Sequence, residues 1–263
     1  MTAPARTGTI LDRILEQRRA RVARRKFDLP PGLVRRAAET APPARDFAAA
    51  LARDSVNIIA ECKKASPSRG VLREDFRPAD LARGLEQAGA AALSVLTEED
   101  FFQGQLSHLS AARQEVSVPV LRKDFIFEAW QIWEARSAGA DAVLLIAAIL
   151  DDETLSELLA AGRALGMESL VEVHTGEELT RATDAGARVM GVNNRDLRSL
   201  EVRLETSLEL AAAIPKNCIA VSESGIRTRE DIAQLRAAGF RALLIGEQLM
   251  QAHDPAAALR DLL

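Results

Sequence analysis

The chain has 263 residues, of which 48% are hydrophobic and 27% are charged, and its formal net charge is −4. This length suits a single α/β barrel domain, and the mild acidity gives no electrostatic reason to expect nucleic acid or an anionic membrane as a partner. The two cysteines, Cys62 and Cys218, fit no disulfide or metal-binding spacing, and neither a signal peptide nor a membrane span is evident, so we expect a cytoplasmic location.

Residues 1–55 predict an N-terminal helical extension. Residues 9–26 (TILDRILEQRRARVARRK) have the spacing of an amphipathic helix, and residues 45–54 (RDFAAALARD) predict a second, shorter one. The first helix places Ile10, Leu11, Ile14 and Leu15 on one side, and we expect this apolar stripe to pack across one end of the domain. We interpret its arginines as a solvated face, because the acidity of the whole chain disfavours a nucleic-acid-binding arm.

Residues 56–263 repeat one unit, in which a β-rich run is followed by a turn and an amphipathic helix. The β-rich runs are VNIIAE (56–61), ALSVLT (92–97), VPVLRK (118–123), AVLLIA (142–147), ESLVEV (168–173), VMGVN (189–193), CIAVSE (218–223) and ALLIG (242–246). A glycine of the kind that ends a helix precedes five of them, in QAGA, SAGA, ALGM, DAGA and AAGF.

Strands that alternate with helices pair in parallel, and their near-continuous Val, Ile and Leu content predicts burial on both faces. Eight such units predict a (β/α)8 TIM barrel, with residues 1–263 forming one domain. An open doubly wound sheet is the alternative fold. No glycine fingerprint of a dinucleotide site follows the first strand, however, which favours the barrel.

Charged side chains stand where the predicted strands end, which is where this fold carries its active site. Glu61 and Lys63 end the first strand, Lys123 the third, Glu172 the fifth and Glu223 the seventh. Strand side chains alternate, so that a Lys123 facing the barrel axis places Phe125 there too, and turns Arg122 and Asp124 away. Isolated charges on the axis would be costly, and we therefore expect a functional pocket.

Two glycine-containing turns predict a phosphate site. SESGI (222–226) and LIGEQLM (244–250) follow the last two strands, and the backbone N–H groups of Ser224, Gly225, Gly246 and Glu247 can converge there on an anion. If Gly246 faces inward, the carboxylate of Glu247 turns away. His174 reaches the pocket edge by its spacing from Glu172, but we expect no role for it in the chemistry. No metal-binding motif is present, and we expect no cofactor.

Several segments together resemble the indole-3-glycerol phosphate synthase family, in the order of that family and over nearly the whole chain. They are IIAECKKASPSRG (58–70), LTEEDFFQG (96–104), LRKDFI (121–126), ADAVLLI (140–146), LVEVH (170–174), GVNNRDL (191–197), SESGI (222–226) and LIGEQLM (244–250). The resemblance implies a TIM barrel whose N-terminal extension covers the catalytic end. It also implies a carboxy-lyase of tryptophan biosynthesis, which closes 1-(2-carboxyphenylamino)-1-deoxyribulose 5-phosphate to indole-3-glycerol phosphate with loss of CO2 and water. Asp100 departs from the family pattern, in which a basic residue is common.

The resemblance assigns a role to each candidate residue. Lys123 matches the general acid and Glu172 the catalytic glutamate, and Glu61 and Lys63 are placed to serve the later proton transfers. The other substrate contacts that it implies are Ser66, Phe102, Phe125, Leu144, Ile146, Asn193, Arg195, Leu197, Glu223 and Ser224. Phosphate contacts are implied for Lys63, Ser224, Gly225, Gly246 and Glu247.

Two other functions remain open from the sequence. A phosphoribosylanthranilate isomerase shares the barrel, but lacks the ECKKASPS strand and the N-terminal extension. A non-catalytic phosphosugar-binding protein would keep the phosphate site and lose the acid, and the presence of both Lys123 and Glu172 speaks against it. The expected partner is a small phosphorylated substrate, and not nucleic acid or a membrane. We expect a monomer, with a weak dimer as the alternative.

Overall fold

A closed barrel of eight parallel strands forms the centre of the computed structural model, which describes residues 8, 10–196 and 199–263. The strands lie in the order β1-β10-β9-β8-β7-β6-β5-β4, and each segment predicted as a strand forms one. Their bounds are β1 (Asn57–Cys62), β4 (Ala92–Leu96), β5 (Val120–Lys123), β6 (Ala142–Ile146), β7 (Glu168–Val173), β8 (Val189–Asn193), β9 (Ile219–Glu223) and β10 (Ala242–Ile245). The TIM barrel prediction is confirmed.

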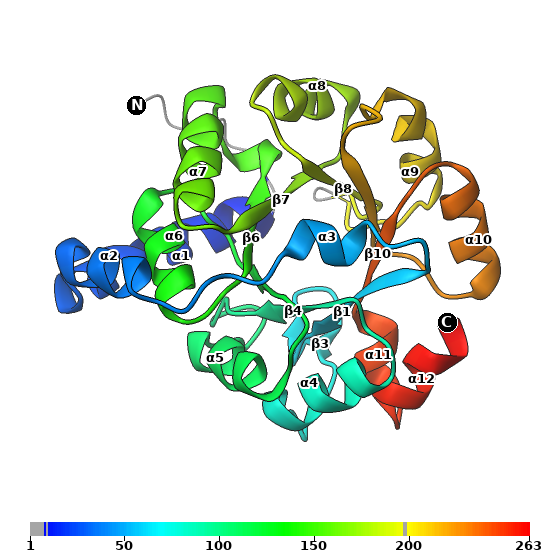
Figure 1. Cartoon of the computed structure of the whole chain (residues 1–263), viewed down its shortest axis with the longest axis horizontal. Helices are drawn as coiled ribbons and strands as arrows, with labels where there is room; N and C mark the ends of the chain where they lie inside the picture. Colours follow the sequence, from blue (N-terminus) through cyan, green and yellow to red (C-terminus); the bar gives the residue numbers. More distant parts are fainter. Residues whose placement is uncertain (1–7, 9, 197–198) are drawn as a thin grey trace.

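Helices surround the barrel, as Figure 1 shows. They are α4 (Pro78–Gln87), α5 (Leu106–Glu115), α6 (Ala129–Ser137), α7 (Asp152–Ala164), α8 (Gly176–Asp184), α9 (Glu205–Leu210), α10 (Arg229–Ala237), α11 (Glu247–Gln251) and α12 (Pro255–Leu262), with the 3-10 turns η1 (Ala147–Ile149) and η2 (Ala211–Ala213). The loop after β1 also forms a small hairpin, β2 (Ala65–Ser66) with β3 (Gly70–Val71), which the sequence pattern did not predict.

The glycines that precede the strands adopt the backbone conformation expected of them. Their φ angles lie between +73° and +107°, a region that glycine enters without the steric cost of a Cβ atom. They are Gly89, Gly139, Gly166, Gly186 and Gly239. Each helix therefore stops at a defined residue and returns the chain to the next strand.

The N-terminal extension covers both ends of the barrel. It consists of α1 (Ile10–Asp28), α2 (Pro31–Glu39) and α3 (Phe47–Leu51), of which α2 was not predicted. Helix α3 crosses the barrel end that faces the viewer in Figure 1, where Asn57 Nδ2 at the start of β1 donates to the Leu51 carbonyl at 2.9 Å. Ile10, Leu11 and Ile14 of α1 instead line a pocket beside the loops that follow the strands. The apolar stripe thus packs where it was expected, and α3 closes the opposite end.

Candidate active site

The carboxyl ends of β5, β7 and β9 bring one lysine and two glutamates together. Lys123 Nζ lies 2.9 Å from Glu172 Oε2 and 2.7 Å from Glu223 Oε2. The Lys123 side chain retains 13% of its exposure, whereas those of Glu172 and Glu223 retain 4% and 1%. Lys123 is therefore the most exposed of these three side chains.

Lys63 and Glu61 form a second pair at the end of β1. Lys63 Nζ lies 2.8 Å from Glu61 Oε1, and both residues line a cavity of about 840 Å³. Lys123, Glu172 and Glu223 do not line this cavity. Glu61 lines it and also acts by its charge on Lys123 and Glu223, and it therefore links the cavity to the cluster.

Two glycines provide the space that the buried glutamates occupy. A Cβ atom on Gly191 would lie 2.1 Å from Glu223 Oε1, and one on Gly246 would lie 2.5 Å from Glu61 Oε1. Gly246 was expected only to bring backbone close to phosphate, and Gly191 was not singled out at all. The sequence shows that Gly191 lies in a strand and that Gly246 directly follows one. It does not show which side chain occupies the space that a Cβ atom would fill.

Charge pairing sets the protonation of the cluster. Burial would lower the pKa of Lys123, but the negative charges of Glu172, Glu223 and Glu61 outweigh it and hold the pKa above its usual value. Burial raises the pKa of Glu223 to about 7, with Lys123 opposing that shift and the Glu172 charge adding to it. The pKa of Glu172 is instead lowered, because the charges of Lys123 and His174 outweigh its burial. The two glutamates beside Lys123 therefore differ in proton affinity.

His174 contacts this cluster, on the face where its spacing from Glu172 placed it. Its Nε2 lies 3.4 Å from Glu172 Oε1, and its Nδ1 lies 3.2 Å from Glu178 Oε2 in the first turn of α8. The spacing of two residues from Glu172 placed it on the correct face. The missing information was the position of Glu178, which depends on where α8 begins.

The wider cavity holds the residues predicted to bind phosphate. Ser224 and Gly225 line it, with φ angles of +67° and +82°, so that the chain turns sharply at the end of β9. Among the described residues, neither of their backbone N–H groups donates a hydrogen bond within the protein. Successive N–H groups in such a turn form an anion-binding concavity.

The expectation that the Glu247 carboxylate turns away from the cavity is wrong. Its Oε1 lies 3.1 Å from Arg69 Nε and its Oε2 lies 3.2 Å from Arg195 Nη2, and both arginines line the cavity. Arg69 and Arg195 hold the carboxylate at the cavity by ion pairing. The alternation of strand side chains, on which the expectation was based, does not predict these partners. Arg195 is further held by donation from Nη1 to the Leu200 carbonyl at 3.2 Å, and its backbone N–H donates to Asn193 Oδ1 at 3.0 Å.

A smaller apolar pocket of about 100 Å³ adjoins the wide cavity. Its wall includes Phe102 and Phe125, whose ring centroids are 6.2 Å apart, and the side chains of α1 named above. Ser66 also lines it, and its buried Oγ has no hydrogen-bond partner among the described residues. The two cavities share the lining residues Lys63, Ser68, Arg195, Leu200 and Glu247.

Two of the predicted apolar contacts are placed differently. Leu144 and Ile146 lie on β6 with 2% and 3% exposure and line neither cavity. In the parallel register Ile146 is paired with Glu172, so the two side chains share a face of the sheet. Leu197 falls outside the described residues. Leu200, nearby in the same loop, lines both cavities instead.

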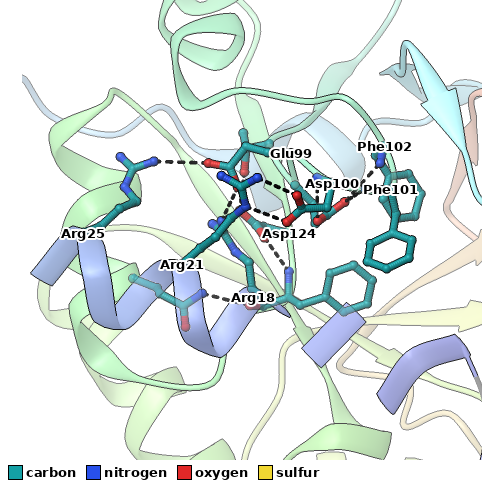
Figure 2. Close-up of polar contacts among 12 residues, drawn as sticks. Arg18, Arg21, Arg25, Glu99, Asp100, Phe101, Phe102 and Asp124 are labelled. Carbon is teal, nitrogen blue, oxygen red and sulfur yellow. Dashed lines mark hydrogen bonds and ion pairs between the residues drawn. The ribbon is translucent and has the colours of Figure 1, made fainter. Parts of the chain in front are cut away.

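Figure 2 shows how α1 is attached to the loop after β4. Arg18 Nη1 lies 2.7 Å from Glu99 Oε2, while Arg18 Nη2 lies 2.6 Å from Asp124 Oδ2. One turn further along the helix, Arg21 donates to both carboxylate oxygens of Asp100 at 2.5 Å. The expectation of a solvated arginine face is wrong for Arg18, which is fully buried, because acidic partners from distant segments meet it there.

Asp124 connects this attachment to the outer side of β5. Arg122 Nη2 lies 2.9 Å from Asp124 Oδ2 and 2.7 Å from Glu134 Oε2 of α6, and Thr97 donates to Asp124 at 2.5 Å. Arg25 of α1 reaches Glu134 Oε1 at 2.8 Å. Arg122 and Asp124, which turn away from the barrel axis, therefore form the charged network that holds α1. Lys123 lies between them in the sequence and faces the axis.

Among the described residues, no three His, Cys, Asp or Glu side chains are grouped so as to hold a metal ion. In the same part of the chain, no helix has the length and apolar character needed to cross a membrane.

Comparison with known proteins adds independent information. The family model for indole-3-glycerol phosphate synthase matches residues 11–262. The proteins of that name from Roseiflexus sp. (strain RS-1) and Variovorax paradoxus (strain S110) are 51% and 49% identical, over 97% and 95% of this chain and 98% and 97% of their own. Among solved structures, 3-hexulose-6-phosphate synthase from Salmonella typhimurium aligns with a TM-score of 0.63 at 13% identity, covering 79% of this chain and 96% of that one. The last likeness concerns the fold alone.

Proposed function

Because the chain belongs to the indole-3-glycerol phosphate synthase family, we propose that the cluster around Lys123 carries out that family's ring closure. The reaction converts 1-(2-carboxyphenylamino)-1-deoxyribulose 5-phosphate to indole-3-glycerol phosphate, with loss of CO2 and water. The protein is thus a carboxy-lyase of tryptophan biosynthesis. The observation that carries the residue assignment is the position of Lys123 Nζ between Glu172 and Glu223.

In this proposal Lys123 is the general acid of the first step. An aromatic carbon attacks the substrate ketone only when the ketone oxygen is protonated, and Lys123, which its raised pKa keeps charged, has a proton to give. Glu172 and Glu223 orient the ammonium, and the negative charge of Glu172 balances the cationic intermediate that follows. Decarboxylation then restores the aromatic ring, driven by the iminium formed within the substrate, so no metal or cofactor enters the scheme.

The pair formed by Glu61 and Lys63 is placed for the dehydration. This step needs a base to remove a proton from carbon and an acid to protonate the departing hydroxyl group. The 2.8 Å contact between Lys63 and Glu61 keeps one donor and one acceptor together at the cavity wall. The assignment of individual later proton transfers to these two residues is part of the proposal.

The two adjoining cavities suit the two ends of the substrate. We assign the carboxyphenyl ring to the apolar pocket between Phe102 and Phe125, and the phosphate to the backbone turn at Ser224 and Gly225. Lys63 and Arg195 line both cavities and supply positive charge between them. Ser66, Asn193, Gly246, and the backbone of Glu247 complete the proposed substrate contacts, with Leu144 and Ile146 behind them.

We further propose that the chain acts as one domain, as a monomer and in the cytoplasm. Leu11 and Leu15 of α1 and Phe47 and Leu51 of α3 belong to the same hydrophobic cluster as the barrel strands, which supports one folding unit. Both cysteines are free, as suits a reducing compartment. Light scattering after gel filtration tests the monomer, and a concentration-dependent mass would replace it with a weak dimer.

The function itself is tested by adding the carboxyphenylamino substrate and following indole fluorescence together with CO2 release. We expect both signals to rise at equal rates without added metal. Conversion of phosphoribosylanthranilate would instead identify an isomerase, and binding of the substrate without turnover would identify a phosphosugar-binding protein. Either of these outcomes would overturn the proposed residue roles as well.

A further inference from the structure

His174 stands between two carboxylates at the mouth of the barrel. Its ring nitrogens lie 3.4 Å from Glu172 Oε1 and 3.2 Å from Glu178 Oε2, and its backbone N–H donates to the same Glu178 oxygen at 2.7 Å. The Glu178 backbone N–H is in turn held by the Thr175 hydroxyl, which caps α8. The imidazole side chain is 12% exposed, so few water molecules compete for these contacts.

This arrangement favours a doubly protonated ring. An ionised carboxylate only accepts hydrogen bonds, and a neutral imidazole has only one N–H to donate. The Nε2 contact with Glu172 at 3.4 Å has the distance of an ion pair without the geometry of a hydrogen bond. In a neutral ring the nitrogen without a proton would turn its lone pair toward one of the two carboxylates, so the position between both favours the imidazolium. In agreement, burial would lower the pKa of His174, but the two carboxylates outweigh it and raise the pKa to about 10.

The imidazolium makes the two glutamates beside Lys123 unequal. Glu172 has Lys123 on one oxygen and His174 on the other, whereas Glu223 has Lys123 alone. The second oxygen of Glu223 is buried and has no hydrogen-bond partner among the described residues. Of the two carboxylates, Glu223 therefore has the higher proton affinity, and Glu172 keeps its negative charge.

We propose that His174 is a positioning residue for the ring closure: by holding the outer oxygen of Glu172, it keeps that carboxylate ionised and directed at Lys123. The inference rests on the proposed roles of Lys123 and Glu172. It assigns a purpose to a side chain that does not line either cavity. The charged groups that face the ring are Glu172 from β7 and Glu178 from α8, with Lys123 of β5 across the shared carboxylate.

The first test is spectroscopic and does not depend on activity. The chain has three histidines, so ¹⁵N-histidine spectra of the full protein contain few signals, and His174→Gln identifies those of His174. We expect both ring nitrogens of His174 to remain protonated from about pH 6 to pH 9, whereas an unperturbed histidine titrates near pH 6.5. A neutral tautomer at pH 8 would overturn the proposal. Should His174→Gln fail to fold, the wild-type titration alone still decides this point.

The second test separates positioning from a merely structural role. We expect His174→Gln to lower kcat by about tenfold or more with little change in KM, because Lys123 is then less well aligned. The pKa of Glu172 rises in this variant, so an acid limb should appear in the kcat profile where the wild type has none. His108→Gln is the matched control, since His108 of α5 contacts the Phe76 ring and forms no ion pair with a carboxylate among the described residues.

Glu178→Gln gives the complementary result. This change leaves the contact of His174 with Glu172 in place but removes one of the charges that hold the ring proton. We expect the kcat profile to lose activity on its alkaline side, at the pH where the ¹⁵N spectra show His174 deprotonating. Wild-type kcat and pH dependence in both variants would refute the positioning role. If the wild type turned over no substrate, the proposed function would be wrong. The protonation state of His174 is decided independently of this, by the ¹⁵N spectra.

Discussion

Arg18 of α1 and Asp124 of the strand end that carries Lys123 are both buried and lie 2.6 Å apart, although 106 residues separate them in the chain. Asp124, which follows the proposed acid Lys123, thus forms an ion pair with the N-terminal extension. Replacing Arg18 by Met should lower the free energy of unfolding by about 3–5 kcal/mol, because Asp124 stays buried and loses one of its cationic partners.

Arg24→Met is the matched control for this change, since Arg24 is exposed on the same helix. Urea unfolding of both variants measures the difference. Equal stability of the Arg18 variant and the wild type would show that the buried pair contributes nothing net to the folded state. A rise in KM of Arg18→Met alone would further connect the position of α1 to the apolar pocket.

Replacing Lys123 by Ala should reduce kcat by about a hundred- to ten-thousand-fold, the range typical of a positioned general acid. Substrate binding should persist, because the phosphate and ring contacts lie in cavities that Lys123 does not line. Steady-state kinetics and a binding titration measure the two effects, with Lys216→Ala at an exposed position as control. A variant with near wild-type kcat would move the acid role to Lys63.

The raised pKa of Glu223, about 7, predicts a pH dependence of stability. Between the usual carboxyl range and pH 7 the folded state binds more protons than the unfolded state, so stability falls as pH rises through this window. Replacing Glu223 by Gln should reduce that fall, as measured by urea unfolding at pH 5 and pH 6.5. The exposed Glu230→Gln should retain the wild-type dependence. An unchanged slope in the Glu223 variant would show that its carboxyl group is ordinary.

The exposed pair formed by Arg21 and Asp100 should couple weakly. A double-mutant cycle with Arg21→Ala and Asp100→Asn is expected to give about 0.2–1 kcal/mol, since Arg21 retains 46% of its side-chain exposure. About 1 M salt should abolish most of the coupling. Strictly additive effects at low salt would mean that this pair does not fasten the loop that carries Phe102.

A chain that begins near Ala44 should fold cooperatively and bind substrate poorly. It retains α3 and the complete barrel, but loses the α1 side chains that line the apolar pocket. Circular dichroism melting should show one transition at a lower temperature, and kinetics should show a raised KM and a reduced kcat/KM. Unchanged kinetics would contradict a catalytic role of the extension, and a chain without a melting transition would make α1 part of the folding core.

The barrel could be predicted from sequence because its signals are local. Buried parallel strands read as runs of Val, Ile and Leu, and glycines such as Gly89 mark the helix ends with a conformation that few other residues adopt. The hairpin between Ala65 and Val71 was not predicted, because each of its strands has two residues. Two residues are too few to show the alternation of side chains by which a strand is recognised.

The site was predictable where strand alternation decides it and unpredictable where distant partners do. Lys123 and Glu172 meet because alternation turns both inward. The burial of Arg18 depends on Glu99 and Asp124, and the contact of Glu247 depends on Arg69 and Arg195, which no helical or strand period can reveal. The ion pair of His174 with Glu178 could not be predicted for the same reason, because Glu178 reaches the ring only once α8 has formed.

The attachment of α1 also orders events during synthesis. Helix α1 is made before the barrel strands and carries Arg18, whose partners Glu99 and Asp124 are made 81 and 106 residues later. Until β5 and the loop after β4 emerge, this arginine has no partner in the finished arrangement, and the apolar side of its helix has no pocket to cover. Helix α1 is therefore made before the barrel but is among the latest elements to reach its native position, and a ribosome-bound chain that stops short of residue 124 should leave it accessible to protease.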